Sequence, residues 1–180
     1  MAVTASPAIR AEAAGDFDAI DEVVTQAFGG PLEAQLVRNI RASQEHVAEL
    51  ALVAVVDNAI VGHVMVSHCT LQQEAEKYEI ATLSPVSVSP EHQGNGIGSA
   101  IIRDVIARAN VRREPLLVVE GSPLYYPRFG FRPAAELGIA IHLPDWAPPE
   151  AAMAMALDSY RAELRGNVVY SAAFDDVTPD

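Results

Sequence analysis

The segment Val86–Ser99 constrains this chain most, because it joins a strand to an amphipathic helix through a glycine-rich turn. The turn follows the pattern Gln93-x-x-Gly96-x-Gly98. Glycine lets the backbone turn tightly and approach a ligand closely. The first N–H groups of a helix lack partners within it and lie at the positive end of its dipole. The segment therefore predicts an anion site suited to phosphate, placed between a strand and a helix.

Hydrophobic periodicity divides the rest of the chain into helices and strands. Apolar residues recur at helical spacing in two segments near the start, and valine-rich runs follow them. Asp16 is the expected N-cap of the first helix, and Asp57-Asn58 a tight turn between strands. The pattern predicts strands at 8–12, 50–56, 60–70, 78–88, 115–120, 151–157 and 168–171; helices at 17–28, 32–40 and 97–109; a short helix at 123–129; one or two strands within 131–142; an exposed loop at 71–77; and a loose tail at 175–180.

Length and charge limit the classes of protein. The 180 residues suit one domain, and we expect residues 1–180 to form a single mixed α/β unit. The net charge of −12 repels nucleic acid and suits a cationic partner, such as a small amine or a basic peptide. The longest apolar run, Leu50–Val56, is far shorter than the roughly 18 residues that span a bilayer. Cys69 is the single cysteine, which excludes an internal disulfide and a cysteine-cluster metal site.

Two common phosphate-binding motifs fit the turn poorly. A Walker loop would need a Lys-Ser/Thr pair after the glycines, and none follows. In a Rossmann fingerprint the third glycine comes one residue later than Gly98 does here. A dinucleotide-dependent enzyme stays an alternative, because Glu120 could serve as its acidic ribose ligand after the next strand.

Two motifs in register carry a resemblance to a known family. Gln93-x-x-Gly96-x-Gly98 after a strand resembles the pyrophosphate-binding motif of the GCN5-related N-acetyltransferase (GNAT) superfamily. Tyr125–Phe131 resembles the tyrosine motif that follows it in this superfamily, and Gly121–Phe131 resembles a bacterial subgroup of predicted N-acetyltransferases. The resemblance covers about residues 7–142, with a C-terminal loop and strands at 143–180. It implies a mostly antiparallel twisted sheet flanked by helices, with one central strand pair splayed apart.

The resemblance also implies a cosubstrate and site residues. Acetyl-CoA would enter beside the strand 78–88, where Pro85 predicts a bulge or a local edge. Tyr126 would be the general acid that protonates the departing thiolate, since a phenol is protonated at neutral pH. Backbone groups of Val86 and Val88 would bind the pantetheine arm. The pyrophosphate would be bound by Gln93, Gly94, Asn95, Gly96, Ile97, Gly98 and Ser99.

The general base stays open at this point. Some relatives place a glutamate eleven residues before the glutamine of the glycine loop, but this chain has Thr82 there. A threonine hydroxyl is no base near neutral pH. The candidate substitutes are His63, His68, Glu79 and Glu120. Arg128 is expected to meet either a CoA phosphate or an internal carboxylate, and Trp146 to line the acceptor pocket or to cover an edge.

The resulting expectation is an enzyme that transfers acetyl from acetyl-CoA directly to a primary amine of a small molecule or peptide. Because the sequence shows no obvious general base, a non-catalytic acyl-CoA sensor or interaction module stays an alternative. Without a secretory signal in the sequence, we expect a cytoplasmic protein that uses no metal and binds neither membrane nor nucleic acid. The C-terminal strands offer an edge for a second copy, so a homodimer stays open.

Overall fold

The computed structural model describes residues 6–175 and 177, and its strands form one sheet. The strands run in the order β1-β2-β3-β4-β5-β8-β6, and β9 and β7 join beside β3. Pairing is antiparallel except between β4 and β5 and between β7 and β9. The predicted mixed, mostly antiparallel sheet is confirmed. The strands are β1 (Ala8–Ala11), β2 (His46–Val56), β3 (Ala59–Gln73), β4 (Glu76–Val88), β5 (Leu116–Glu120), β6 (Arg132–Pro133), β7 (Ile139–Ala140), β8 (Ala152–Ala156) and β9 (Gly166–Val169).

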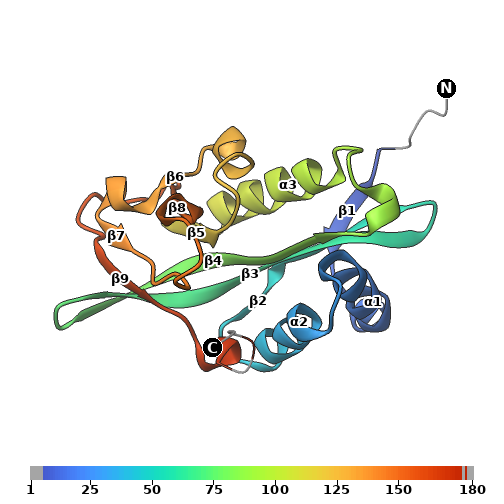
Figure 1. The fold of residues 1–180 in the computed structure, drawn as a ribbon, viewed down its shortest axis with the longest axis horizontal. Coiled ribbons are helices and arrows are strands. Elements are labelled where there is room, and N and C mark those ends of the chain that lie inside the picture. Colours follow the sequence, from blue (N-terminus) through green and yellow to red (C-terminus); the bar gives the residue numbers. More distant parts are fainter. Residues whose placement is uncertain (1–5, 176, 178–180) are drawn as a thin grey trace.

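Helices cover both faces of this sheet (Figure 1). Helices α1 (Phe17–Phe28) and α2 (Leu32–Ala42) pack on one face, where Ile20 and Val24 meet the sheet residue Met65. Helix α3 (Ile97–Val111) packs on the other, over apolar residues of β2–β5. The helix bounds follow the predicted apolar stripes. Asp16 does precede α1, but its carboxylate bonds Arg10 and the N–H of Ala13 rather than capping that helix.

The strands β2, β3 and β4 form a long meander through the middle of the sheet. Asp57 and Asn58 make the predicted turn, with φ of 48° and 63°. The predicted loop at 71–77 is wrong, because β3 and β4 continue as a hairpin to Gln73 and Glu76. This arm projects from the body of the sheet (Figure 1). Leu71 is fully buried there because β9 pairs along the arm and covers it.

The second half of the chain completes the sheet beyond β5. Strand β8 pairs along the whole of β5, and the short β6 adds to β8. The predicted 131–142 region forms two short strands separated by a 3-10 turn, and the predicted helix at 123–129 is a 3-10 turn at Tyr126–Phe129. The last strand lies at Gly166–Val169 rather than 168–171, so Tyr170 lies just outside it. Most of the predicted tail at 175–180 lies outside the described residues.

Candidate active site

The glycine loop links β4 to α3 through a short 3-10 turn at Pro90–His92. Gly94 and Gly96 have φ of 78° and 80°, a left-handed conformation that favours glycine. Gly96 is the N-cap of α3, and no side chain caps the helix there. The first N–H groups of α3 therefore point into an open space instead of toward protein acceptors. This is the position at which the sequence predicts an anion site.

A pocket of about 310 Å³ lies over this helix start. Of the nine residues predicted to contact the cosubstrate, Val86 and Asn95 are absent from its lining. The Asn95 amide instead donates to the carbonyl of His92, over 3.3 Å. The pocket is lined by Val88, His92, Gln93, Gly94, Gly96, Ile97, Gly98, Ser99, Tyr125 and Arg128.

Three of these lining residues were not predicted with the loop: His92, Tyr125 and Arg128. The Tyr125 hydroxyl approaches Gly98 so closely that a Cβ there would lie 3.0 Å from it. The Arg128 guanidinium lies 4.6 Å from the centre of the Tyr125 ring and donates to the carbonyl of Leu124. No carboxylate pairs with Arg128 among the described residues, so its charge faces the pocket mouth. The anion, rather than an internal carboxylate, is therefore its natural partner.

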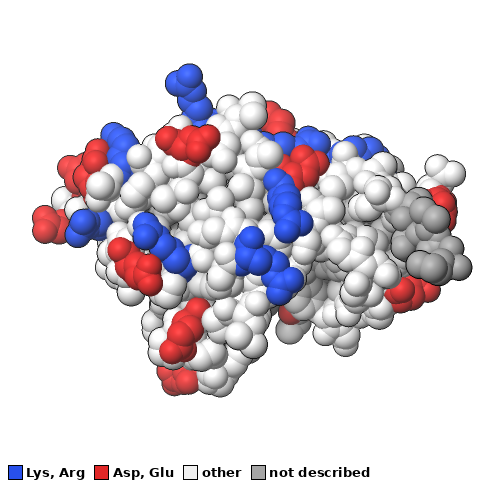
Figure 2. Space-filling view, turned by 90° about the horizontal axis from the view of Figure 1, so that it is seen from above, with Lys and Arg blue, Asp and Glu red and all other residues white. Residues whose placement is uncertain are grey.

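Basic side chains occur on this face despite the net charge of −12. Seen from above, blue and red groups are interspersed there rather than separated (Figure 2). Arg103 of α3 lies 5.4 Å from the ring centre of Phe129 and is not in an ion pair with any described residue. With Arg128 it supplies local positive charge near the helix start, where an anionic ligand needs it.

The strands β4 and β5 separate beside the pocket. Their parallel pairing ends at Ala81↔Leu117 and Thr82↔Val118, although both strands continue. Opposite β3, strand β4 has one extra residue between Leu83 and Val86, which is the bulge predicted at Pro85. The predicted splayed pair is thus present, and the residues of β4 beyond Thr82 have a free edge toward β5.

Backbone groups of β4 point across this gap. The N–H of Ser89 donates to Val61 of β3, over 2.8 Å. Antiparallel pairs alternate in direction, so Val86 and Val88 direct their backbone groups away from β3. The Val88 carbonyl accordingly accepts a hydrogen bond from the Gln93 side chain, over 3.0 Å. Gln93 braces the loop through this bond, and the backbone groups of Val86 remain directed at the gap.

Tyr126 begins the 3-10 turn that follows β5 and folds back onto Gly121, the residue directly after that strand. A Cβ at Gly121 would lie 2.3 Å from Cε2 of Tyr126, so the ring packs directly on that glycine. The rings of Tyr125 and Phe131 contact it edge to face, with centroids 5.3 and 5.6 Å away. Burial, with a smaller contribution from Tyr125, raises the pKa of Tyr126 to about 12. The phenol is therefore protonated at neutral pH and able to donate.

Two of the four candidate bases lie in polar clusters of their own. His63 is fully buried and bonded through Nε2 to Glu12, over 2.9 Å; burial lowers its pKa, so the imidazole is neutral. His68 bonds Glu114 over 3.1 Å, which raises its pKa and favours the charged form. A charged imidazole cannot accept a proton, and a fully buried one cannot meet a substrate.

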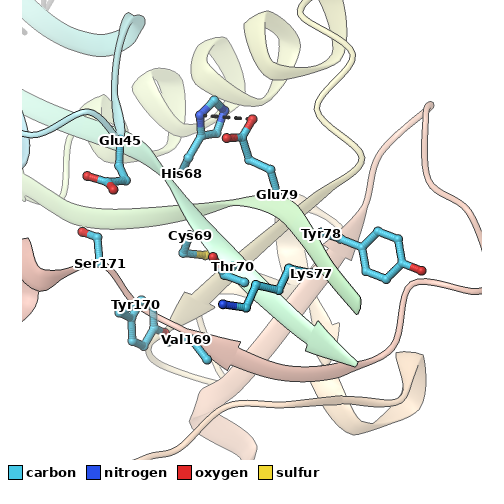
Figure 3. A pocket seen from close by; sticks show the side chains of 10 residues that line it. All are labelled: Glu45, His68, Cys69, Thr70, Lys77, Tyr78, Glu79, Val169, Tyr170 and Ser171. Atoms are coloured by element: carbon cyan, nitrogen blue, oxygen red, sulfur yellow. Dashed lines mark ion pairs between the residues drawn. The ribbon is translucent and has the colours of Figure 1, made fainter. Parts of the chain in front are cut away.

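Glu79 belongs to the same cluster as His68. Figure 3 shows the two side chains pointing toward each other, at 3.5 Å, beside a pocket of about 330 Å³ between β3, β4 and the end of β9. Cys69 lines this pocket, and burial raises the pKa of its thiol to about 12, which disfavours a covalent acetyl-cysteine. Trp146 is exposed and lines neither pocket. Glu120, at the end of β5, remains as the candidate base beside the splayed strands.

The fold and this site together define an acetyltransferase domain of the GNAT type. Residues 8–134, more than two thirds of the chain, match the family model described as acetyltransferase (GNAT) domain. The chain belongs to this family, and the predicted resemblance is confirmed.

Individual relatives agree with the family assignment. The uncharacterized N-acetyltransferase YjhQ of Escherichia coli strain K12 is 35% identical over 120 residues, which is 67% of this chain and 66% of YjhQ. The chain thus spans slightly less than two thirds of that relative. Among solved structures, the GNAT family N-acetyltransferase YhbS of E. coli, in complex with CoA, has a TM-score of 0.84 at 25% identity, over 94% of this chain and 92% of YhbS. A GNAT family acetyltransferase from Brucella melitensis, in complex with acetyl-CoA, has a TM-score of 0.76 at 29% identity, over 94% and 98% of the two chains.

No group of three or more His, Cys, Asp or Glu side chains in the described part of the chain could hold a metal ion. No helix formed by residues 6–175 and 177 is both long and apolar enough to cross a membrane.

Proposed function

We propose that this chain is an N-acetyltransferase that moves the acetyl group of acetyl-CoA directly to a primary amine while both substrates are bound. The observation that carries the proposal is that an anion pocket lies next to a gap between two strands of the sheet. This pocket, at the start of α3, reaches Val88 at the end of β4, where β4 has separated from β5, and Tyr126 packs on Gly121 directly after β5. Two relatives of the same fold are complexes with CoA and with acetyl-CoA, which supports this cosubstrate.

The residues present fit such a cosubstrate. N–H groups at the start of α3 would bind the pyrophosphate, and Arg128 would add a charge-assisted contact to a phosphate. Backbone groups of Val86 would bind the pantetheine arm in the gap, and its N–H would stabilise the negative charge that develops on the thioester oxygen. Val88 would contribute less than the sequence predicts, because Gln93 already occupies its carbonyl. A bound thioester supplies the acyl group, and Tyr126 supplies the proton for the leaving sulfur.

Thermal unfolding with acetyl-CoA, CoA and NADH tests the cosubstrate. A ligand at 100 times its Kd stabilises a protein by about 2.7 kcal/mol, which is a shift of several degrees in Tm for a chain of this size. We expect shifts with acetyl-CoA and CoA and none with NADH. No shift with either CoA species would contradict the proposal, and a shift with NADH alone would favour a dinucleotide enzyme.

A matched pair of glycine variants locates the binding. Gly96 and Gly29 have similar φ, 80° and 75°, and an added Cβ meets nothing within 4 Å at either position. Both Gly96→Ala and Gly29→Ala should therefore lower the stability of the free protein similarly, by about 1–2 kcal/mol. Only Gly96→Ala should weaken CoA binding, because only Gly96 lies under the phosphates.

An amine panel tests turnover. Transfer to one amine class, followed by release of free thiol, is the expected result. Binding of acetyl-CoA without acetylation of any amine would favour a sensor instead. A cytoplasmic location, a homodimer and a single-domain chain stay predictions.

A further inference from the structure

We infer that Glu120, positioned by Tyr170, binds the acceptor ammonium and removes its proton, so the acceptor is an amine that is cationic at neutral pH. This inference rests on the proposed function and names the group that function still lacks. Three observations carry it: the place of Glu120 in the sheet, its hydrogen bond to Tyr170, and an unpartnered buried hydroxyl on the same face of the sheet.

Glu120 is the last residue of β5, two residues beyond the last pair that β5 forms with β4. Its backbone is fixed, because β8 pairs with it at Ala152 and the next N–H, of Gly121, donates to Ala151. Side chains two residues apart on a strand share a face, so Glu120 lies on the same face as Val118. Val118 is the partner of Thr82, the position where the resemblance leads us to expect a carboxylate. The carboxylate is thus present on the same face, one strand over.

Tyr170 fixes the orientation of the carboxylate. Its hydroxyl donates to Oε1 of Glu120 over 2.7 Å, and its ring stacks on Phe174 with centroids 4.9 Å apart. Burial and the nearby Glu120 raise the pKa of Tyr170, so its hydroxyl stays protonated and remains a donor. The bond uses one carboxylate oxygen and leaves Oε2 for a second partner.

One buried polar group on this face of the sheet lacks a hydrogen-bond partner. Ser67 of β3 is the cross-strand partner of Thr82, and it is fully buried. Within the described part of the chain, Oγ of Ser67 has no hydrogen-bond partner. Buried hydroxyls are normally bonded, so this orphan, on the same face and two strands from β5, points to a ligand or water that completes it. This face lies opposite α3 and the anion pocket, which separates the acceptor from the phosphates.

The chemistry then balances. The Glu120 carboxylate takes one proton from R–NH₃⁺, which breaks an N–H bond and leaves a lone pair on nitrogen. That lone pair attacks the thioester carbon; a C–N bond forms, and collapse of the adduct breaks the C–S bond. Tyr126 gives its proton to the leaving sulfur and regains one from the amide nitrogen. The proton on Glu120 passes to solvent, so the products are an N-acetyl amine, CoA thiol and one proton.

The test begins with the wild-type chain, an acetyl-CoA binding assay and the best amine of the panel. If wild type neither binds acetyl-CoA nor transfers acetyl, the proposed function fails and the role of Glu120 falls with it. If wild type is active, Glu120→Gln keeps size and hydrogen bonding but removes the base. We expect kcat/KM for the amine to fall about 100-fold or more, while the Kd for acetyl-CoA stays within about twofold.

Two further readouts separate a base from a structural residue. In Glu120→Gln the amine must lose its proton to water first, so kcat/KM should rise about tenfold per pH unit below the pKa of the amine. The titratable group in contact with Glu120 is Tyr170, and Cys69 lies close enough to Tyr170 to act on it; both are protonated throughout this range. Tyr170→Phe should lower kcat/KM in wild type and have no further effect in Glu120→Gln, since it acts through that carboxylate.

Glu79→Gln is the matched comparison, because Glu79 is an exposed glutamate of the neighbouring strand β4 that pairs with His68 and precedes the residues at which β4 pairs with β5. It should leave kcat/KM within about twofold of wild type. The inference is overturned if Glu120→Gln keeps wild-type kcat/KM, if it loses acetyl-CoA binding instead, or if Glu79→Gln causes the loss. Partial recovery in Glu120→Asp would support it.

Discussion

Among single residues, Tyr126 is the one whose environment best matches its proposed task. Burial raises its pKa to about 12, so the proton it must donate is retained well above neutral pH. Removing the hydroxyl in Tyr126→Phe should lower kcat by about 10²- to 10⁴-fold, the usual contribution of a general acid. Acetyl-CoA affinity should be unchanged, and steady-state kinetics with a separate binding assay would measure both.

Two other tyrosine variants control this prediction. Tyr160→Phe removes a hydroxyl from the apolar cluster under β7 and β9, and should leave kcat unchanged. Tyr125→Phe removes the hydroxyl above Gly98 and tests the neighbouring candidate. If Tyr125→Phe loses kcat while Tyr126→Phe does not, the assignment from motif register is wrong.

The sequence predicts those parts of the site whose residues are close neighbours in the chain. The glycine loop and Tyr126 follow from motifs, since each is a run of neighbouring residues. Arg128 could not be assigned, because its partner is decided by how the turn after β5 folds back over α3. His63 and Glu120 were equal candidates for the base. Only the pairing of strands shows that one is buried against Glu12 and the other ends at the gap.

Among elements, the connection from β5 to the turn at Tyr126–Phe129 positions Tyr126, the proposed general acid. Gly121 has no side chain, and the Tyr126 ring fills that space. Gly121→Ala would place a Cβ 2.3 Å from the ring and force it to move. We expect kcat to fall, with a small change in acetyl-CoA affinity, because a displaced acid affects the chemical step.

The control for Gly121→Ala is Gly30→Ala, where an added Cβ meets nothing within 4 Å. It should change neither kcat nor Tm appreciably. Unchanged kcat in Gly121→Ala would mean that the ring does not need this position.

A buried polar cluster away from the pocket links Glu12, directly after β1, with Arg41 of α2 and His63 of β3. Glu12 bonds His63 over 2.9 Å and Arg41 over 2.7 and 3.0 Å. Burial alone would raise the pKa of Glu12, but these hydrogen bonds outweigh it and lower the pKa to about 2. A pKa lowered in the folded state stabilises the fold above the unfolded value of 4.5, and that contribution is lost as pH falls toward 2.

The resulting prediction concerns stability rather than activity. Glu12→Gln should lower the free energy of unfolding by about 3 kcal/mol at pH 7, and the difference from wild type should shrink below pH 4.5. Urea unfolding of both proteins across this range measures it. A difference that does not depend on pH would show that packing, not charge, holds the cluster together.

The sequence predicts the helices and strands correctly where a single hydrophobic periodicity continues without interruption. The three helices and the strands β5 and β8 are of this kind. The sequence predicts a loop at 71–77 because its residues are mostly polar and show no alternation of apolar side chains. This region forms the end of the β3–β4 hairpin, where Leu71 pairs with Tyr78 and Gln73 with Glu76, and β9, about 100 residues later in the chain, adds a second partner at Thr70–Gln72. The pairing with β9 joins residues so far apart in the chain that the sequence around 71–77 gives no sign of it.

For the whole molecule, the net charge of −12 should act on the acceptor at long range. Raising the ionic strength from about 0.01 M to about 0.1 M shortens the Debye length from about 30 Å to about 10 Å. We therefore expect KM to rise more for a polycationic amine than for a monocationic one, with kcat unchanged for both. Equal salt effects on the two amines would show that only the local site selects charge.

The position of β9 and Tyr170 relative to the family domain has an evolutionary consequence. Residues 8–134 contain the glycine loop, the splayed strands and Tyr126, whereas Tyr170 lies beyond them. If Tyr170 orients the Glu120 carboxylate that binds the acceptor amine, residues 8–134 bind the acetyl donor. A separate, later segment then sets which acceptor amine is bound. Lineages can then exchange that segment, and with it the amine they modify, while the machinery for the thioester is inherited intact.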